Sequence, residues 1–240
     1  MNYFNFESNI VPDNLLMNST LEQSELLPEG KTYRVLIADD HAIVRIGLRL
    51  MIKHLSGGIH VEEAMNGETV IGKLKTGTFD LLILDINMPN TESFSLAGYI
   101  LKEYPLLKIL IFTVSRELIF AKRFLKLGVH GYLQKQTNEK ETLMAIRTVL
   151  SGQVFVSDLF VSAISEELIH PENNNPFELL TDREFEVALH ILRGSSIAAT
   201  AGTLHLNRST VGTHKSRVMK KLRLGSTIDL LELAKKYKIV

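Results

Sequence analysis

Short apolar runs alternate along the first two thirds of the chain with longer segments whose apolar residues recur at helical spacing. The runs that predict strands cover residues 33–38, 59–64, 81–84, 108–113 and 132–134. The segments that predict helices cover residues 43–51, 69–75, 95–104, 117–127 and 139–150. A run without polar positions, such as 81–84, is typical of a parallel strand that is covered on both faces. The pattern therefore predicts an α/β fold with a five-stranded, doubly wound parallel sheet.

The pattern changes towards the C-terminus, where the residues following a Pro- and Asn-rich break at 170–176 are wholly helical. Thr181 and Glu184 have the spacing of a capping box, which predicts a helix that Gly194 ends. Further helices are expected over residues 197–204, 209–222 and 227–236. We therefore expect a small all-α domain of four helices in this part of the chain.

These patterns divide the chain into four parts. Residues 1–30 show no sustained period and predict a flexible acidic tail. Residues 31–153 form the α/β domain, 154–175 a linker, and 176–240 the four-helix domain.

The charge of the chain is unevenly distributed, although its 240 residues hold 27 basic and 27 acidic side chains. Residues 177–240 carry 11 basic and 6 acidic side chains, whereas residues 1–30 carry 5 acids and no base. A hydrophobic content of 45% excludes disorder throughout. The chain has no Cys, which excludes disulfides and Cys-based metal sites. We find no membrane-spanning run and no signal peptide, and expect a cytoplasmic protein that does not bind a membrane.

Polar side chains follow the expected strands at the points where ligands bind in open parallel sheets. They are Asp39, Asp40, Asp85, Thr113 and Lys135. Neighbouring carboxylates repel one another, and a hard divalent cation such as Mg²⁺ relieves that repulsion. One carboxylate is then free to act as a nucleophile that forms an aspartyl-phosphate, with the lysine and threonine binding phosphoryl oxygens. Taken singly, these residues are explained equally well as a helix cap, a solvated lysine and a strand-end threonine, so the prediction depends on their convergence.

The strings around these residues resemble the receiver domain of two-component response regulators, which has a flavodoxin-like fold, over residues 31–153. They are Ile37-Ala38-Asp39-Asp40-His41, Leu84-Asp85-Ile86-Asn87-Met88-Pro89, Phe112-Thr113 and Tyr132-Leu133-Gln134-Lys135. The resemblance implies that Asp85 is the phospho-acceptor and that Mg²⁺ is held by Asp39, Asp40, Asp85 and the backbone carbonyl of Asn87. It also implies that Thr113 binds the phosphoryl group, that Lys135 pairs with it, and that Tyr132 is an aromatic switch.

The basic C-terminal helices have the arrangement of a helix-turn-helix, in which the second helix enters the major groove of DNA. A basic helix face alone is also typical of a solvated surface. The wider string, from Leu180-Thr181-Asp182-Arg183-Glu184 through Asn207-Arg208-Ser209-Thr210-Val211 to Lys221-Leu222, resembles the LuxR/NarL-type DNA-binding domain over residues 176–240. The residues expected to contact double-stranded DNA are Arg208, Thr210, Thr213, His214, Lys215, Arg217, Lys220 and Lys221.

The two resemblances together predict a phosphorylation-dependent transcription factor of the NarL/FixJ class, which is not an enzyme. Its expected partners are a sensor histidine kinase that phosphorylates Asp85, double-stranded DNA, RNA polymerase, and a second copy of the chain that binds on phosphorylation. One alternative is a Mg²⁺-dependent phosphohydrolase, but such enzymes need a carboxylate at the position of Asn87. Another is a signalling module with a weakened or non-DNA-binding C-terminal domain, because the sequence departs from the family pattern at Ala199, Thr200 and Gly212.

Overall fold

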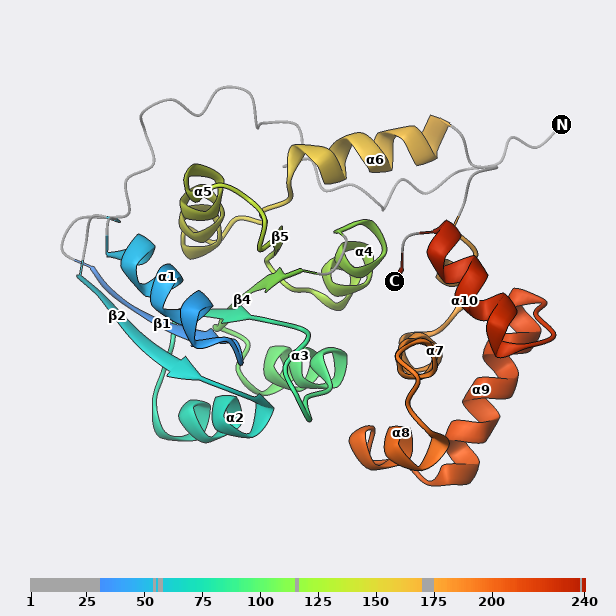
Figure 1. Cartoon of the computed structure of the whole chain (residues 1–240). Helices are drawn as coiled ribbons and strands as arrows, with labels where there is room; N and C mark the ends of the chain where they lie inside the picture. The colour runs from blue at the N-terminus through green and yellow to red at the C-terminus, as the bar shows by residue number, and fades with distance from the viewer. Residues whose placement is uncertain (1–30, 54, 56–57, 115–116, 170–174, 238) are drawn as a thin grey trace, which may run out of the picture.

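The computed structural model describes residues 31–53, 55, 58–114, 117–169, 175–237 and 239–240 (Figure 1). The predicted flexible tail, residues 1–30, and most of the Pro- and Asn-rich break lie outside the described residues. None of the helices in the described ranges has the length and hydropathy needed to cross a membrane.

The N-terminal domain is built on five parallel strands in the order β2-β1-β3-β4-β5, which confirms the predicted doubly wound sheet. The strands are β1 (Thr32–Ala38), β2 (Gly58–Ala64), β3 (Leu81–Leu84), β4 (Lys108–Thr113) and β5 (Gly131–Gln134). The connecting helices are α1 (Ala42–Ile52), α2 (Gly67–Thr76), α3 (Ser93–Glu103), α4 (Glu117–Leu127) and α5 (Glu139–Leu150). The strand order reverses between β1 and β3. In open parallel sheets, ligands bind at the carboxyl ends of the strands next to such a reversal, which here are the ends of β1 and β3.

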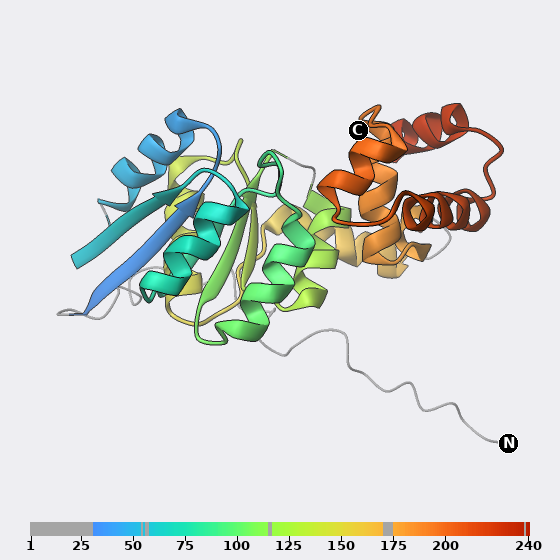
Figure 2. The same ribbon diagram turned by 90° about the horizontal axis from the view of Figure 1, so that it is seen from below.

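Helices cover both faces of the sheet (Figures 1 and 2). Side chains of α1 and α5 form one core with alternate residues of the strands, and α2, α3 and α4 form the other core with the remaining ones. All four residues of β3 are buried, as expected of a central strand.

The expected helix α1 is present, but its apolar stripe faces outward. Ile43, Ile46 and Leu50 are 75%, 40% and 53% exposed, whereas Leu48 and Ile52 are buried in the core. Because the helix carries apolar residues on two faces, its periodicity did not show which face the sheet covers.

The predicted linker, residues 154–175, contains a helix, α6 (Asp158–Ile169), that packs on α4. The residues that follow form a 3-10 turn, η3 (Pro176–Leu179), and the four expected helices. These are α7 (Asp182–Leu192), α8 (Ile197–Thr203), α9 (Arg208–Leu222) and α10 (Thr227–Lys236). The predicted capping box of α7 is confirmed, because Thr181 and Glu184 exchange the two expected hydrogen bonds.

Helix α8, the turn that follows it and helix α9 have the arrangement of a helix-turn-helix. Helices α8 and α9 pack together around Ala201, Leu204 and Val211, with Val187 of α7 completing the small core. The turn between them passes through His205, whose φ of 48° is left-handed. Helix α9 lies on the side of the domain that faces away from the sheet (Figure 1).

Candidate functional site

Asp39 and Asp85 directly follow the neighbouring strands β1 and β3, and they lie side by side at the carboxyl ends of these strands. The backbone N–H of Asp39 donates to the carbonyl of Ala64 at 3.1 Å, and that of Asp85 donates to the carbonyl of Ala38 at 2.8 Å. Both aspartates are only 1% exposed. The sheet register therefore fixes two buried carboxylates side by side.

Lys135, directly after β5, bridges these two carboxylates. Its Nζ lies 2.6 Å from Oδ2 of Asp39 and 2.7 Å from Oδ2 of Asp85. Burial by itself lowers the pKa of the Lys135 ammonium, but its hydrogen bonds to Asp39 and Asp85 outweigh burial, so that its pKa lies above the ordinary value. The lysine therefore stays charged and neutralises part of the repulsion between the carboxylates.

The acidic side chains at this edge offer ligands for a metal ion. Oxygen or nitrogen atoms of Asp39, Asp40, His41 and Asp85 all lie within 4.8 Å of one another. The loop after Asp85 stays close to them, because the backbone N–H of Asn87 donates to Oδ1 of Asp85 at 3.1 Å. Three carboxylates form a donor set that suits a hard divalent cation.

Thr113, the last residue of β4, is connected to this cluster through Asn87, and Tyr132 lies on the neighbouring strand β5. The hydroxyl oxygen of Thr113, which is fully buried, accepts a hydrogen bond of 2.9 Å from the side-chain amide of Asn87. The ring of Tyr132 is also fully buried, and its centroid lies 6.5 Å from that of Phe124 on α4. The structure thus brings together six of the seven residues predicted for the receiver site, and it places the seventh, Tyr132, on the adjoining strand β5 against Phe124.

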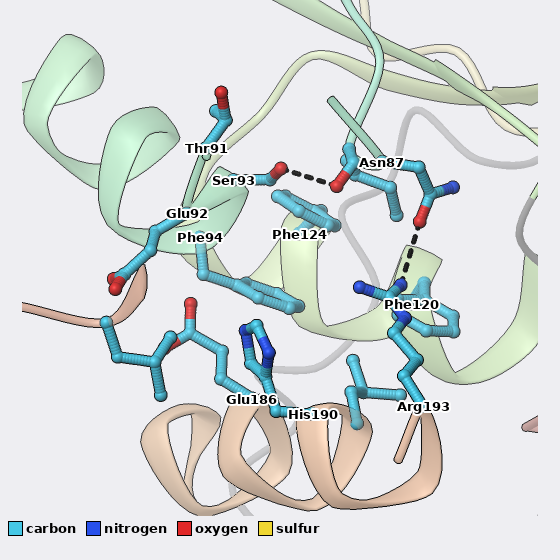
Figure 3. A pocket seen from close by; sticks show the side chains of 13 residues that line it. Asn87, Thr91, Glu92, Ser93, Phe94, Phe120, Phe124, Glu186, His190 and Arg193 are labelled. Atoms are coloured by element: carbon cyan, nitrogen blue, oxygen red, sulfur yellow. Dashed lines mark hydrogen bonds between the residues drawn. The ribbon is translucent and has the colours of Figure 1, made fainter. Parts of the chain in front are cut away.

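Three residues near the site were not predicted. His41 lies with its Nδ1 2.9 Å from Oδ1 of Asp40. Arg45 on α1 donates to the backbone carbonyl of Asp39 at 2.8 Å and pairs with Glu63. Arg193, at the end of α7, donates to the side-chain oxygen of Asn87 at 3.0 Å (Figure 3). His41 directly follows the acidic pair and was detectable, whereas the two arginines reach the site only through the fold.

The loop after Asp85 carries Ser93 at its end, at the start of α3. The Ser93 hydroxyl donates to the carbonyl of Ile86 at 2.7 Å, a bond that Figure 3 shows across the loop. Asn90 in the same loop has a left-handed φ of 52°. These features hold the loop that carries Asn87 in one shape.

The eight residues predicted to contact DNA lie on α9, and five of them are exposed. The exposed ones are Arg208, Thr213, Arg217, Lys220 and Lys221. Thr210, His214 and Lys215 are half-buried. The exposed side chains present a basic surface on one helix, which suits the phosphates of a nucleic acid.

Lys221 and His214 interact with neighbouring groups inside the domain. Lys221 pairs with Glu184 at 2.6 Å and donates to the carbonyl of Leu179 at 3.1 Å, which ties α9 to the start of α7. Burial, and then the charge of Arg217, lower the pKa of His214 below the ordinary value. His214 is therefore neutral at pH 7.

Two family models match the chain. The model described as the response regulator receiver domain matches residues 35–147. The model described as bacterial regulatory proteins of the LuxR family matches residues 178–234. Together they account for both of the domains that the fold contains.

Relatives of known name are similar to the chain over nearly their whole length. The response regulator GacA of Pseudomonas viridiflava is 32% identical over 86% of this chain and 97% of its own. The oxygen regulatory protein NreC of Staphylococcus epidermidis is 31% identical over 86% of this chain and 99% of its own.

Solved structures of RcsB share the fold. RcsB from Salmonella enterica serovar Typhimurium, bound to promoter DNA in the presence of the phosphomimetic BeF3−, aligns with a TM-score of 0.70 at 24% identity, over 86% of this chain and all of its own. A structure of two RcsB dimers on two parallel DNAs aligns with a TM-score of 0.54 at 24% identity, over 85% of this chain and 98% of its own. The chain belongs to the response regulators that join a receiver domain to a LuxR-type DNA-binding domain, a family of transcription factors and not of enzymes.

Proposed function

We propose that Asp85 accepts a phosphoryl group from a sensor histidine kinase in the cytoplasm, and that this phosphorylation controls the binding of α9 to double-stranded DNA. The observation that carries the proposal is the ion pair of Lys135 with Asp85 and Asp39 at the carboxyl edge of the sheet. A buried carboxylate beside a lysine can act as a nucleophile, and the acyl phosphate that it forms keeps the lysine as its cationic partner.

The chemistry of the transfer follows from the contacts of Asp85. A carboxylate oxygen attacks the phosphorus of the kinase phosphohistidine, the N–P bond breaks, and the imidazole keeps the electron pair. Lys135 then pairs with a phosphoryl oxygen, and the Thr113 hydroxyl donates to another after it leaves Asn87. Asp39, Asp40, Asp85 and the backbone carbonyl of Asn87 would hold Mg²⁺, which neutralises phosphoryl charge when it is bound.

The DNA contacts are proposed for the exposed side of α9. Arg208, Arg217 and Lys220 would neutralise phosphates, and Thr213 is also exposed. Thr210, His214 and Lys215 are half-buried and would contact DNA only with their outer atoms. Lys221, which pairs with Glu184, would contribute mainly by orienting the helix.

A homodimer on phosphorylation is the third part of the proposal. RcsB is described as binding DNA as dimers, and two-fold symmetry would place two copies of α9 on paired half-sites. The outward stripe of Ile43, Ile46 and Leu50 on α1 is an apolar surface that a second copy would cover.

The test compares the full chain with its Asp85→Asn variant, each treated with acetyl phosphate and Mg²⁺. Phosphorylation is followed by the mass of the intact protein, dimerisation by sizing, and DNA affinity by mobility shift on genomic fragments at several salt concentrations. We expect only the wild type to gain the mass of a phosphoryl group, to dimerise and to bind DNA more tightly. Equal DNA affinity of both proteins after treatment would contradict the proposed control.

A further inference from the structure

The C-terminal end of α7 touches the loop that follows the phospho-acceptor. Nη2 of Arg193 donates to the side-chain oxygen of Asn87 at 3.0 Å, and both residues line a small cavity of about 50 Å³ between the two domains (Figure 3). A residue of the DNA-binding domain therefore contacts a residue that lies two positions from Asp85.

The side chain of Asn87 is held at both ends of its amide. Its nitrogen donates to the Thr113 hydroxyl oxygen at 2.9 Å, while its oxygen accepts from Arg193. An amide has distinct donor and acceptor ends, so these two contacts fix one orientation of the group. The Arg193 contact thus favours the arrangement in which Asn87 binds Thr113.

Stronger contacts hold α7 against the receiver and keep Arg193 in place. The ring of Phe185 on α7 packs edge-on against Phe120 and Phe94, at centroid distances of 5.3 and 6.5 Å. Arg183 on α7 pairs with Glu92, just before α3, at 2.6 Å. Arg193 is therefore presented to Asn87 by a docked helix, although its own side chain is exposed.

We propose that Arg193 is a positioning residue of the phosphorylation site, which acts through Asn87 and stabilises the unphosphorylated arrangement of Thr113. The inference rests on the proposed function, in which the Thr113 hydroxyl turns from Asn87 to the phosphoryl group. When the Thr113 hydroxyl leaves, Asn87 loses the contact at its amide nitrogen, and its oxygen becomes a less well oriented acceptor for Arg193. Because coupling is reciprocal, phosphorylation weakens the contact of α7 with this loop, and losing the contact favours phosphorylation.

The docked helix does not act by covering α9, whose predicted DNA-contacting residues Arg208, Arg217 and Lys220 are exposed in this structure. Docking instead fixes the orientation of α9 relative to the receiver domain. Release of the contact between Arg193 and Asn87 would let the C-terminal domain reorient, so that the α9 helices of two chains can bind paired half-sites.

The first test measures the initial rate of Asp85 phosphorylation by acetyl phosphate and Mg²⁺ in the full chain. Arg193→Ala should raise this rate about threefold. That is the effect expected when one exposed hydrogen bond is lost that opposes the turn of the Thr113 hydroxyl away from Asn87. Arg193→Lys, which keeps a cationic donor, should stay nearer the wild type. Lys126→Ala, at an exposed position near the end of α4, removes an equal charge away from the loop and is the matched control.

The effect must also disappear when Asn87 is removed. In an Asn87→Ala background, a further Arg193→Ala change should leave the rate unaltered. A slower rate in Arg193→Ala would overturn the inference, because it is the result expected if the arginine only attracts the acetyl phosphate anion. An unchanged rate, or the same increase in the Asn87→Ala background, would overturn it as well.

A second readout follows the docking of the domains. The chain has no Cys, so Leu106→Cys and Ile228→Cys, at positions 89% and 68% exposed, accept a dye pair at defined places in the receiver and on α10. Energy transfer should change on phosphorylation of the wild type, and an unchanged signal in phosphorylated protein would overturn the coupling. If the wild type gains no phosphoryl group at Asp85, the proposed function itself fails; phosphorylation without an Arg193 effect contradicts only this inference.

Discussion

Replacing Lys135 with Met removes the cation that bridges two buried carboxylates and retains most of the side-chain volume. The side chain of Lys135 is 9% exposed, and those of Asp39 and Asp85 are 2% and 1% exposed. Removing one member of a buried ion pair costs about 3–5 kcal/mol, because the remaining charges stay desolvated. Asp40, at 30% exposure, lets water and ions approach, so we expect a loss near the lower limit, about 3 kcal/mol, in metal-free buffer.

The assay is urea unfolding of the full chain, followed by far-UV circular dichroism, in EDTA and in excess Mg²⁺. A divalent cation at one hundred times its dissociation constant stabilises a folded protein by about 2.7 kcal/mol. Mg²⁺ should therefore restore most of the lost stability in Lys135→Met. It should stabilise the variant more than the wild type, because Lys135 no longer competes for the same oxygens.

Lys102, which is 83% exposed, gives the matched control. Lys102→Met should alter stability by less than about 0.5 kcal/mol in either buffer. A loss below about 1 kcal/mol for Lys135→Met in EDTA would refute the reasoning, as would equal stabilisation of variant and wild type by Mg²⁺. Because the folded pKa of Lys135 is raised, its contribution is complete below its ordinary pKa and is lost as the pH rises through the folded value.

Four further predictions concern the rest of the chain. Arg217→Ala should weaken DNA binding at all sequences and reduce the salt dependence of the affinity by about one unit of slope, measured by titration at several salt concentrations. Burial raises the pKa of Glu186 to about 7; the charges of Glu92 and Asp182 add to this effect and Arg183 opposes it. Docking of α7 should therefore weaken as the pH rises through 7, because Glu186 then loses its proton. Glu186→Gln should abolish that change in energy transfer between domain labels. Gly212→Ala should raise the free energy of unfolding by about 1 kcal/mol in a urea titration, since a Cβ there meets nothing within 4 Å. Ile46→Asp should prevent phosphorylation-dependent dimerisation, seen by sizing, without lowering the amount of phosphorylated protein.

The strands and the acidic cluster were predictable because both depend on local sequence. The apolar run at 81–84 ends at Asp85, and a parallel arrangement then places that residue beside the end of β1. The periodicity of α1 predicted the helix but not its buried face. Ile43 and Leu50 face outward because Arg45 takes an inward position and holds the backbone of Asp39.

The contacts between the domains were not predictable from the same patterns. Helix α6 fell in the predicted linker because its burial depends on α4, a partner that no local period reveals. Arg193 and Asn87 are 106 residues apart, and each is an ordinary polar residue in its own segment. Only the docked arrangement of α7 shows that they meet.

The anchor of this docked arrangement is Arg123 on α4, which is 9% exposed. It donates to the backbone carbonyls of Phe177 and Leu180, each at 2.8 Å, and to Asp182 at 2.6 Å. Two of its three acceptors are therefore peptide groups, which every amino acid supplies.

Substitutions at 177 and 180 can thus accumulate in descendants of this chain without removing those hydrogen bonds, provided the hydrophobic packing is kept. A change of Arg123 itself removes all three bonds at once. Substitutions at 177 and 180 are tolerated by these hydrogen bonds, whereas substitutions of Arg123 are not. Comparison of related sequences would therefore show little covariation between position 123 and positions 177 and 180, although Arg123 joins the two domains.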